Sequence, residues 1–517
     1  AETHELTITH LGTSGRRTDR FGDLLFALDT DRLDFPMGDG GTTRLRLPAG
    51  RYHLESTVLS GADADPDFHT VVRPLITLDR DKSVTIDARA TLPVTVAPPR
   101  PGARLALVDL AYRRQGADPG RVLESGILSH RLDDTYTAHQ GPTVGPDELV
   151  DRVNTQWARP DGKGGFADTP YFYGLYWLSR GRYLTGFTGR AEPAELATVR
   201  SRHVAQSADG QVRRSFAPST STGEGVGIGG WSVGIPFRTP SSVAAHLMAG
   251  GVRWSGSLAH TRGTGREQAE LSWLSAPPRA YTAGQTYDER WNAAVLGPAL
   301  PGSTPGADPA VARHGDRIVV AMPMYADQAG HLGGSRTDRA ETTLYRGRGR
   351  ERTKVGASDG VGTAEFDVPR RRASYQLVTS ATRHRFADYS TRVEASWTFR
   401  SARAPRSGTV LPVSVVRFAP PVDARNRVSG VGPTLVPVTV QSQLGKPDLR
   451  VRRLSVQAST DDGRTWEPVR LLRRPHDERV AVVPHPPGPA YVSLRARLVD
   501  LHGSRSEQTI IRAYAVR

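Results

Sequence analysis

Three positions in the sequence carry residue types that could serve as a catalytic serine or histidine. A serine nucleophile needs a general base and a strained turn flanked by glycine, and no G-x-S-x-G occurs. Ser14 stands in the small-residue run "GTSG", but two arginines follow where a buried catalytic helix would have to begin. His314 and His502 each precede a glycine without the Thr-His continuation of a catalytic histidine motif. We therefore expect loops at all three positions.

Acidic and histidine residues with metal-like spacing occur in two places. Asp63, Asp65 and Asp67 alternate as in a calcium loop. An EF-hand is excluded, because glycine is missing at the sixth position and a proline stands where the bidentate glutamate belongs. A surface loop is favoured over an irregular calcium site. His130 and His139 are nine residues apart with no third ligand evident. We predict no metal and no cofactor.

Glycine and arginine runs raise the question of nucleotide or nucleic-acid binding. Residues 225–230 satisfy G-x-G-x-x-G, but Pro236 and a further glycine argue against the helix N-terminus that would hold a pyrophosphate. Residues 346–352 alternate arginine with other residues, yet no aromatic side chains are interleaved for base stacking. We interpret this run as a solvated hairpin tip and expect no nucleic-acid partner.

Aromatic residues are concentrated in one short segment. Seven of the chain's 36 aromatic residues fall within residues 171–187. Exposed aromatic rings on a sheet can stack on sugar rings or peptide side chains, whereas inward rings fill a core. Core packing is the favoured interpretation, and a ligand platform is the functional alternative. The residues of that possible platform are Tyr171, Tyr173, Tyr176, Trp177 and Tyr183.

Residues 459–466, "STDDGRTW", match the S-x-D-x-G-x-T-W pattern of a sialidase Asp-box. An alternating strand precedes the motif and another follows it, so the motif predicts a hairpin turn. In that turn Gly463 supplies a positive φ, aspartate side chains accept amide N–H groups, and Trp466 covers the turn. A sialidase would need several such boxes, one per propeller blade, and a tyrosine nucleophile. We therefore expect a structural hairpin.

Short alternating apolar runs, 53 Gly and 38 Pro indicate strands rather than helices. Residues 43–55 predict a hairpin in which Leu47, Tyr52 and Leu54 face the core and residues 48–50 form the turn. Residues 84–87 and 105–110 predict further strands. The best helix candidate is residues 147–157, where apolar residues recur at helical spacing.

Proline and glycine clusters divide the chain. We place boundaries at the cluster after residue 97, at the linker-like residues 297–306 and near residue 405. The expected domains are residues 1–97, 98–310, 311–405 and 406–517. The predicted fold class is mainly β, with several tandem antiparallel β-sandwich domains.

Composition limits the classes of protein that the chain can belong to. There is no Cys, so disulfides, thiolate metal sites and a cysteine nucleophile are excluded. The net charge is +15, and 64 of the 68 basic residues are arginine, which suggests a GC-rich coding sequence more than a polyanionic partner. No apolar run approaches the ~18 residues of a membrane span. The chain begins Ala-Glu, which reads as a mature or excised segment.

Five segments together resemble the long C-terminal extension of secreted subtilisin-like (S8) serine peptidases from actinomycetes such as Streptomyces. They are residues 26–32 (FALDTDR), 47–52 (LPAGRY), 290–298 (RWNAAVLGP), 391–400 (TRVEASWTFR) and 411–420 (LPVSVVRFAP). The resemblance implies secretion and an upstream peptidase domain as partner. The first domain is similar to prealbumin-like or carboxypeptidase-regulatory domains, and the last is similar to fibronectin or immunoglobulin domains. No triad motif is present, so no catalytic residue can be carried over.

The sequence thus leaves two functions from different classes. The first is a non-catalytic accessory region of a secreted subtilisin-like endopeptidase, which stabilises or positions the enzyme or engages large protein substrates. The second is a free-standing extracellular protein that binds cell-wall or plant polysaccharide through the aromatic residues of 171–187. We expect no catalysis by the chain itself under either function. A self-contained hydrolase with an unrecognised site ranks third, because the sequence shows no acid/base pair with plausible local spacing.

Overall fold

The computed structural model describes residues 2–98, 100–221, 227–263, 265–302, 308–347, 349–445, 451–475 and 478–517. Within these ranges the chain is built of β-strands and contains no α-helix. Short 3₁₀ turns that lie wholly within the described ranges are η1 (Ala88–Ala90), η2 (Pro193–Glu195), η3 (Gly265–Glu267) and η4 (Gly349–Glu351). The chain forms tandem antiparallel β-sandwiches, as the sequence predicts. No described helix is long and apolar enough to cross a bilayer.

The N-terminal sandwich packs a three-stranded sheet against a seven-stranded sheet around Leu6, Leu25 and Leu54. The smaller sheet has the order β4 (Thr42–Pro48), β1 (Thr3–Leu11), β7 (Lys82–Asp87). The larger sheet has the order β14 (Phe187–Arg190), β8 (Leu92–Ala97), β11 (Thr135–His139), β6 (Asp65–Leu78), β5 (Gly50–Ala62), β2 (Phe21–Ala27), β3 (Leu33–Asp34).

The central region contains a second seven-stranded sheet and a six-stranded sheet, packed around Phe172, Phe216 and Trp254. The first has the order β10 (Val122–Ser129), β9 (Arg104–Gln115), β12 (Leu149–Ala158), β13 (Tyr171–Arg180), β19 (Ser241–Met248), β15 (Leu196–His203), β22 (Thr286–Trp291). The second has the order β17 (Gly227–Gly229), β16 (Gln211–Ser221), β20 (Arg253–Arg262), β21 (Ala269–Ala280), β25 (Leu332–Ser335), with β18 (Ile235–Arg238) also on β16.

The C-terminal region joins a four-stranded sheet to a twelve-stranded one around Val320, Trp397 and Phe399. The small sheet has the order β28 (Thr363–Asp367), β24 (Arg317–Ala321), β23 (Val311–His314), β31 (Thr409–Val410). The large sheet has the order β27 (Thr353–Ser358), β26 (Arg339–Arg346), β29 (Ala373–Thr382), β30 (Arg392–Ser401), β39 (Arg505–Val516), β38 (Ala490–Asp500), β35 (Val451–Ser459), β36 (Glu467–Arg473), β37 (Arg479–Val483), β34 (Thr434–Ser442), β32 (Ser414–Phe418), with β33 (Arg427–Val428) on β39.

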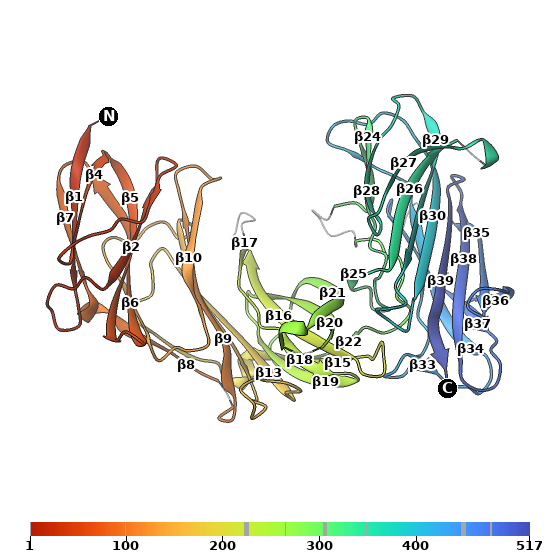
Figure 1. Ribbon diagram of the computed structural model, residues 1–517, viewed down its shortest axis with the longest axis horizontal. Helices are drawn as coiled ribbons and strands as arrows, with labels where there is room; N and C mark the ends of the chain where they lie inside the picture. The colour runs from red at the N-terminus through yellow and green to blue at the C-terminus, as the bar shows by residue number, and fades with distance from the viewer. Residues whose placement is uncertain are drawn as a thin grey trace.

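Figure 1 shows these regions following one another along the chain, from the red N-terminal sandwich through the green centre to the blue C-terminal sheets. Strand pairing nevertheless crosses all three boundaries expected from the sequence. β11 and β14 lie beyond residue 97 but extend the sheet of β8 and β6, and β25 pairs with β21 across residue 310. β31 likewise pairs with β23 across residue 405.

Three local predictions need correction. Residues 149–158 form β12 rather than a helix, and every residue of β12 is buried. β4 and β5 do not pair as a hairpin, because β4 pairs with β1 and β5 with β2 and β6. The chain passes from one sheet to the other at Ala49, between the two strands. The predicted linker is buried over residues 297–300, where Gly297 and Ala326 exchange backbone hydrogen bonds. Its residues 303–307 lie outside the described ranges.

Candidate functional site

Four of the five possible platform residues are buried. Tyr171, Tyr173, Tyr176 and Tyr183 are each less than a tenth exposed. Their rings meet other aromatic groups: Tyr171 contacts Tyr173 edge-on, and Tyr183 contacts Tyr112. At these four positions the burial matches core packing, the interpretation favoured from the sequence, and not the alternative of an exposed platform. The physical reason is that both faces of β13 are covered over its first six residues.

Trp177 is the fifth residue of that group and is partly exposed. Its ring contacts Phe187 edge-on, with 5.3 Å between the ring centroids. Gly189 lies beneath this pair, because a Cβ atom there would stand 2.5 Å from Phe187 and 3.1 Å from Trp177. A pair of half-covered rings offers less stacking area than a platform of all five residues would.

The Asp-box residues form the predicted hairpin turn between β35 and β36. Gly463 has φ +83°, and its N–H donates to Ser459 Oγ over 2.9 Å. Hydrogen bonds from the hydroxyl and the N–H of Thr465 hold the pKa of Asp461 well below its usual range. Trp466 donates from Nε1 to the Gly463 carbonyl. Ser459, Asp461 and Thr465 therefore serve the turn, whereas the Asp462 carboxylate accepts hydrogen bonds from Arg512 of β39.

The side chains considered for metal binding make hydrogen bonds and ion pairs with other residues. His130 contacts the carbonyl of Ala106, and His139 contacts the carbonyl of Gly141. Asp63 and Asp65 form ion pairs with arginines. Within the described ranges no three His, Asp or Glu side chains gather as a metal site would require. Of the G-x-G-x-x-G run, residues 225 and 226 lie outside the described residues.

A groove of about 890 Å³, here called the β25 groove, lies along the last strand of the six-stranded sheet. β25 pairs with β21 on one side and with no described strand on the other. The opposite wall comes from residues 321–325 and 361–363. The principal lining residues are Trp273, Met322, Met324, Tyr325, Gly333 and Gly334.

Two glycines on β25 shape this groove. Trp273 on β21 is opposite Gly334, and a Cβ atom at Gly334 would stand 2.9 Å from the indole Nε1. A Cβ atom at Gly333 would stand 2.0 Å from the Trp273 carbonyl oxygen. Only glycine therefore lets the indole lie against the strand. The Trp273 side chain remains 49% exposed, which is unusual for so large an apolar residue.

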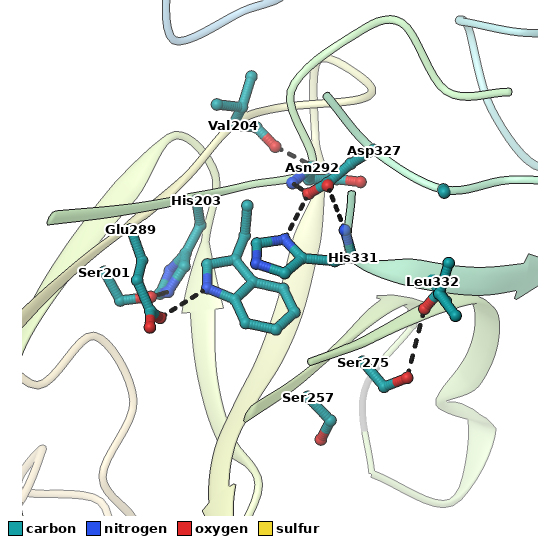
Figure 2. A network of polar contacts seen from close by, with 12 residues as sticks. Ser201, His203, Val204, Ser257, Ser275, Glu289, Asn292, Asp327, His331 and Leu332 are labelled. Carbon is teal, nitrogen blue, oxygen red and sulfur yellow. Dashed lines mark hydrogen bonds and ion pairs between the residues drawn. The ribbon is translucent and has the colours of Figure 1, made fainter. Parts of the chain in front are cut away.

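A second cavity of about 520 Å³, here called the Trp291 pocket, is lined by residues of β16, β20 and β21 in the six-stranded sheet and by β22 of the neighbouring sheet. Its lining includes Arg214, Arg253, Arg279, Tyr281, Trp291 and His331. His331 stacks on Trp291 with ring centroids 3.6 Å apart and an interplanar angle of 8°. Figure 2 shows His331 directed toward Asp327 at one end of this network, with Glu289 at the other.

The orientation of His331 is fixed by Asp327. The buried Asp327 carboxylate accepts hydrogen bonds from His331 Nδ1 over 2.8 Å and from the backbone N–H groups of Asn292 and His331. Because the carboxylate only accepts, Nδ1 carries the ring proton when His331 is neutral. His331 Nε2 then has a free lone pair at the pocket wall and makes no hydrogen bond to any described residue.

Glu289 joins the remaining buried polar groups of the Trp291 pocket. It accepts hydrogen bonds from Arg214 Nη2 over 3.1 Å, from Trp291 Nε1 over 3.1 Å and from the Tyr281 hydroxyl over 2.7 Å. Burial alone would raise the pKa of Glu289, but the Arg214 charge and these donors outweigh it, so the pKa lies below its usual value. Burial lowers the pKa of Arg214 to about 10. Both groups are therefore charged at neutral pH.

The Trp291 pocket presents charged and hydrogen-bonding side chains to a ligand. No described hydroxyl hydrogen-bonds His331 Nε2, so the His331–Asp327 pair has no serine or threonine to activate. Ser201 and His203 do form a pair, with Oγ and Nε2 3.3 Å apart, but both are buried. Burial lowers the pKa of His203 to about 3, and the Arg214 charge adds to this. That histidine is neutral and closed to a substrate.

Sequence reasoning missed every principal residue of both cavities. The pair Asp327 and His331 has an i, i+4 spacing that reads as helical, whereas here it belongs to a loop closed by an Asp327–His331 backbone hydrogen bond. Trp273 alternates with buried neighbours on β21, and the adjacent glycines 333 and 334 are the one local signal of a close approach. The contact between them joins segments about sixty residues apart.

No described protein family and no curated protein matches the sequence. Among solved structures, the chain is similar to the Bacillus anthracis TIE protein, with 8% identity and a TM-score of 0.13 over 56% of this chain and 50% of that chain. It therefore spans about half the length of that structure. It is also similar to Sidekick-1 immunoglobulin domains 1–5, with 10% identity and a TM-score of 0.12 over 96% of this chain and 93% of that chain. Both TM-scores are too low to bear on fold or function.

Proposed function

We propose that the chain is a non-catalytic accessory region of a secreted subtilisin-like serine peptidase and that it engages extended segments of protein substrates. The observation that carries the engagement is the β25 groove, where an unpaired strand edge and a half-exposed Trp273 form one wall. The peptidase parentage is supported by the sequence resemblance alone. Secretion follows from that parentage.

An unpaired strand edge favours a polypeptide ligand over other classes. Such an edge presents backbone N–H and C=O groups at the spacing of a strand, and another backbone in extended form complements them. Because Gly333 and Gly334 have no side chains, the Trp273 indole lies against this strand. β25 is four residues long, which suits a ligand segment of roughly 13 Å. Trp273 would then contact a side chain of the bound segment.

Among the described residues no serine–histidine pair continues from the histidine to a carboxylate, which supports a non-catalytic role. Ser60 Oγ lies 2.9 Å from His69 Nε2, but His69 Nδ1 contacts the Thr91 hydroxyl rather than a carboxylate. His331 has a carboxylate partner in Asp327, but its other nitrogen contacts no described hydroxyl group. A peptidase reaction would therefore have to occur on another domain. A second contact with the same substrate raises the effective concentration of the substrate at that domain.

The binding test uses β-casein as an unfolded polypeptide and a folded protein of similar size as control. We expect the purified chain to bind fluorescently labelled casein and not the folded protein. Trp273→Ala should weaken casein binding at least 5-fold, whereas Trp231→Ala should not, although Trp231 is 64% exposed. Equal binding by both variants, or no binding by the wild-type chain, would contradict the engagement.

Deletion of this region from the parent peptidase should leave cleavage of short peptides unchanged and impair cleavage of large proteins.

The polysaccharide alternative is favoured by one observation, the exposed indole of Trp231. The Trp231 backbone is held by two hydrogen bonds to the central sheet: its N–H donates to the buried Asp109 carboxylate, and its carbonyl accepts from Asn154. A ring held on a fixed loop can stack on a sugar. Retention on insoluble glycans that is lost on Trp231→Ala or Trp177→Ala, without any casein binding, would replace the first proposal with this one.

A further inference from the structure

The Trp291 pocket is separate from the β25 groove and has a different chemistry. We propose that it binds a small ligand bearing a carboxylate, with Arg253 and Arg279 on the carboxylate and His331 Nε2 accepting a hydrogen bond from an adjacent donor of the ligand. This site goes beyond polypeptide engagement and stands independently of it. The argument rests on charge, on the fixed orientation of His331 and on the apolar walls.

The charge of the pocket lining is positive after the internal ion pairs are counted. Its charged residues are Arg214, Arg253, Asp288, Arg279, Glu289 and Arg290. Arg214 pairs with Glu289, and Asp288 pairs with Arg202 outside the pocket. Arg290 donates to the carbonyls of Val422 and Asp423. Arg253 and Arg279 remain without a carboxylate among the described residues, which leaves an uncompensated field for an anion.

Arg279 is held in place without using its hydrogen-bond donors. Its guanidinium lies over Tyr281 and Tyr287, with its central carbon 5.2 and 4.8 Å from the ring centroids. It makes no hydrogen bond or ion pair with any described residue. Cation–π contacts fix the plane of a guanidinium while its N–H groups stay free. Arg279 is therefore poised for a two-pronged contact with a carboxylate.

Arg253 also lines the pocket, and only some of the N–H groups of its guanidinium are hydrogen-bonded. Its Nε and Nη2 donate to the Pro278 carbonyl, over 3.3 and 2.9 Å. The remaining Nη1 has no partner among the described residues. Both Arg253 and Arg279 line the pocket. Two such groups discriminate a carboxylate from a neutral amide by charge as well as geometry.

The rest of the pocket suits an uncharged body with one hydrogen-bond donor. Phe216, Trp254, Pro277 and Pro278 supply apolar walls. His331 Nε2 accepts rather than donates when His331 is neutral, because Asp327 holds the proton on Nδ1. The volume of about 520 Å³ lies in the range of small-molecule sites. Two sources share this chemistry: the C-terminal residue of a peptide, with its amide N–H, and a sugar acid, with its hydroxyl groups.

Isothermal titration calorimetry on the whole chain tests the proposal with four probes and a phosphate control. N-acetyl-phenylalanine is compared with its amide, N-acetyl-phenylalaninamide, and glucuronate is compared with glucose. We expect one carboxylate probe to bind and its neutral partner to bind at least 10-fold more weakly. The better carboxylate identifies the source. Inorganic phosphate should bind more weakly than that probe.

Three variants complete the test. Arg279→Gln should weaken binding of the carboxylate at least 10-fold, and His331→Phe should weaken it while retaining a ring to stack on Trp291. Arg317→Gln, an exposed arginine of the small C-terminal sheet, should have no effect. Thermal unfolding checks that each variant is folded. Binding of neither carboxylate, equal binding of phosphate, or an unchanged affinity in Arg279→Gln would overturn the proposal. Trp273→Ala should leave carboxylate binding unchanged, because Trp273 lines the β25 groove and not the Trp291 pocket. A negative result in the casein experiment would therefore leave the carboxylate proposal standing.

Discussion

Arg152 donates two hydrogen bonds to Asp109 across neighbouring strands of the central sheet, from Nε over 3.1 Å and from Nη2 over 3.2 Å. The two side chains are only 6% and 2% exposed. The same carboxylate accepts the N–H of Trp231 over 2.9 Å and the amide of Asn154 over 3.3 Å. One buried ion pair thus joins β9, β12 and the loop that presents the exposed Trp231.

Asp109→Asn should destabilise the chain strongly, because it leaves the Arg152 charge buried without its partner. Removal of one member of a buried ion pair costs roughly 3–5 kcal/mol. Urea unfolding followed by circular dichroism measures the loss. Asp367→Asn is the matched control, because Asp367 pairs with Arg317 at the surface, and such pairs contribute about 1 kcal/mol or less. Similar losses in the two variants would show that the Asp109 pair is not isolated from water.

Buried His203 predicts a loss of stability in mild acid. Burial and the Arg214 charge lower its pKa to about 3, whereas an unfolded histidine has a pKa near 6.5. Between these values the unfolded chain binds more protons, so stability falls as the pH drops from about 6.5 toward 3. At pH 5 the expected loss in the free energy of unfolding is roughly 2 kcal/mol relative to neutral pH. His203→Gln should reduce this pH dependence in urea titrations at pH 7.5, 5.5 and 4.5, and the exposed His502→Gln should not.

The strand content was predictable because alternating apolar residues and frequent turn residues suffice to exclude helices in most segments. β12 shows where that reasoning fails. All ten of its residues are buried, so the strand has no polar face and its period of two is hidden. Its Asn154 and Gln156 are buried because they hydrogen-bond the backbone of residues 231–233. Leu149, Val153 and Trp157 then fall at helical spacing by coincidence.

Neither cavity was predictable, because each forms between segments that are distant in sequence. Most of the Asp-box turn could be predicted, since the hydrogen bonds of Ser459, Asp461 and Trp466 are made within eight residues. The ion pair of Asp462 with Arg512, fifty residues away, could not. Likewise, Trp291 meets His331 across forty residues, and β25 reaches β21 across the predicted boundary at residue 310. The buried tyrosines of residues 171–183 illustrate the same limit, because their environment depends on strands that pair from elsewhere in the chain.

Gly463→Ala should destabilise the Asp-box hairpin for two separable reasons. The residue has φ +83°, and an added Cβ would stand 2.8 Å from Ile511 Cδ1 and 3.1 Å from the Trp466 ring. The positive φ costs roughly 1–2 kcal/mol for a residue with a side chain. Gly488→Ala measures the cost of the positive φ alone, because Gly488 has φ +96° and open space around its Cβ position. Chemical denaturation should give the larger loss for Gly463→Ala; equal losses would mean that the contacts relax.

Asp151 predicts a pH dependence of opposite sign to that of His203. It is buried on β12, and burial raises the pKa of its carboxyl group well above the usual value, although the Leu184 N–H donates to it over 2.9 Å. The unfolded carboxyl ionises near pH 3.8, whereas the folded one keeps its proton to a higher pH. Between the two pKa values the folded state binds more protons, so rising pH lowers stability by up to about 1.4 kcal/mol per pH unit.

Asp151→Asn removes this titration while keeping an acceptor for Leu184. The stability of the variant relative to the wild type should therefore rise as the pH increases from 4 to 7, as measured by urea midpoints at each pH. Asp147→Asn provides the control, because Asp147 is an exposed partner of Arg180 and is four residues away in the chain. A stability difference between Asp151→Asn and wild type that stays constant over this pH range would mean that Asp151 is ionised in the folded chain. The orphaned Asp151 Oδ1, which has no hydrogen-bond partner among the described residues, would then have to be solvated.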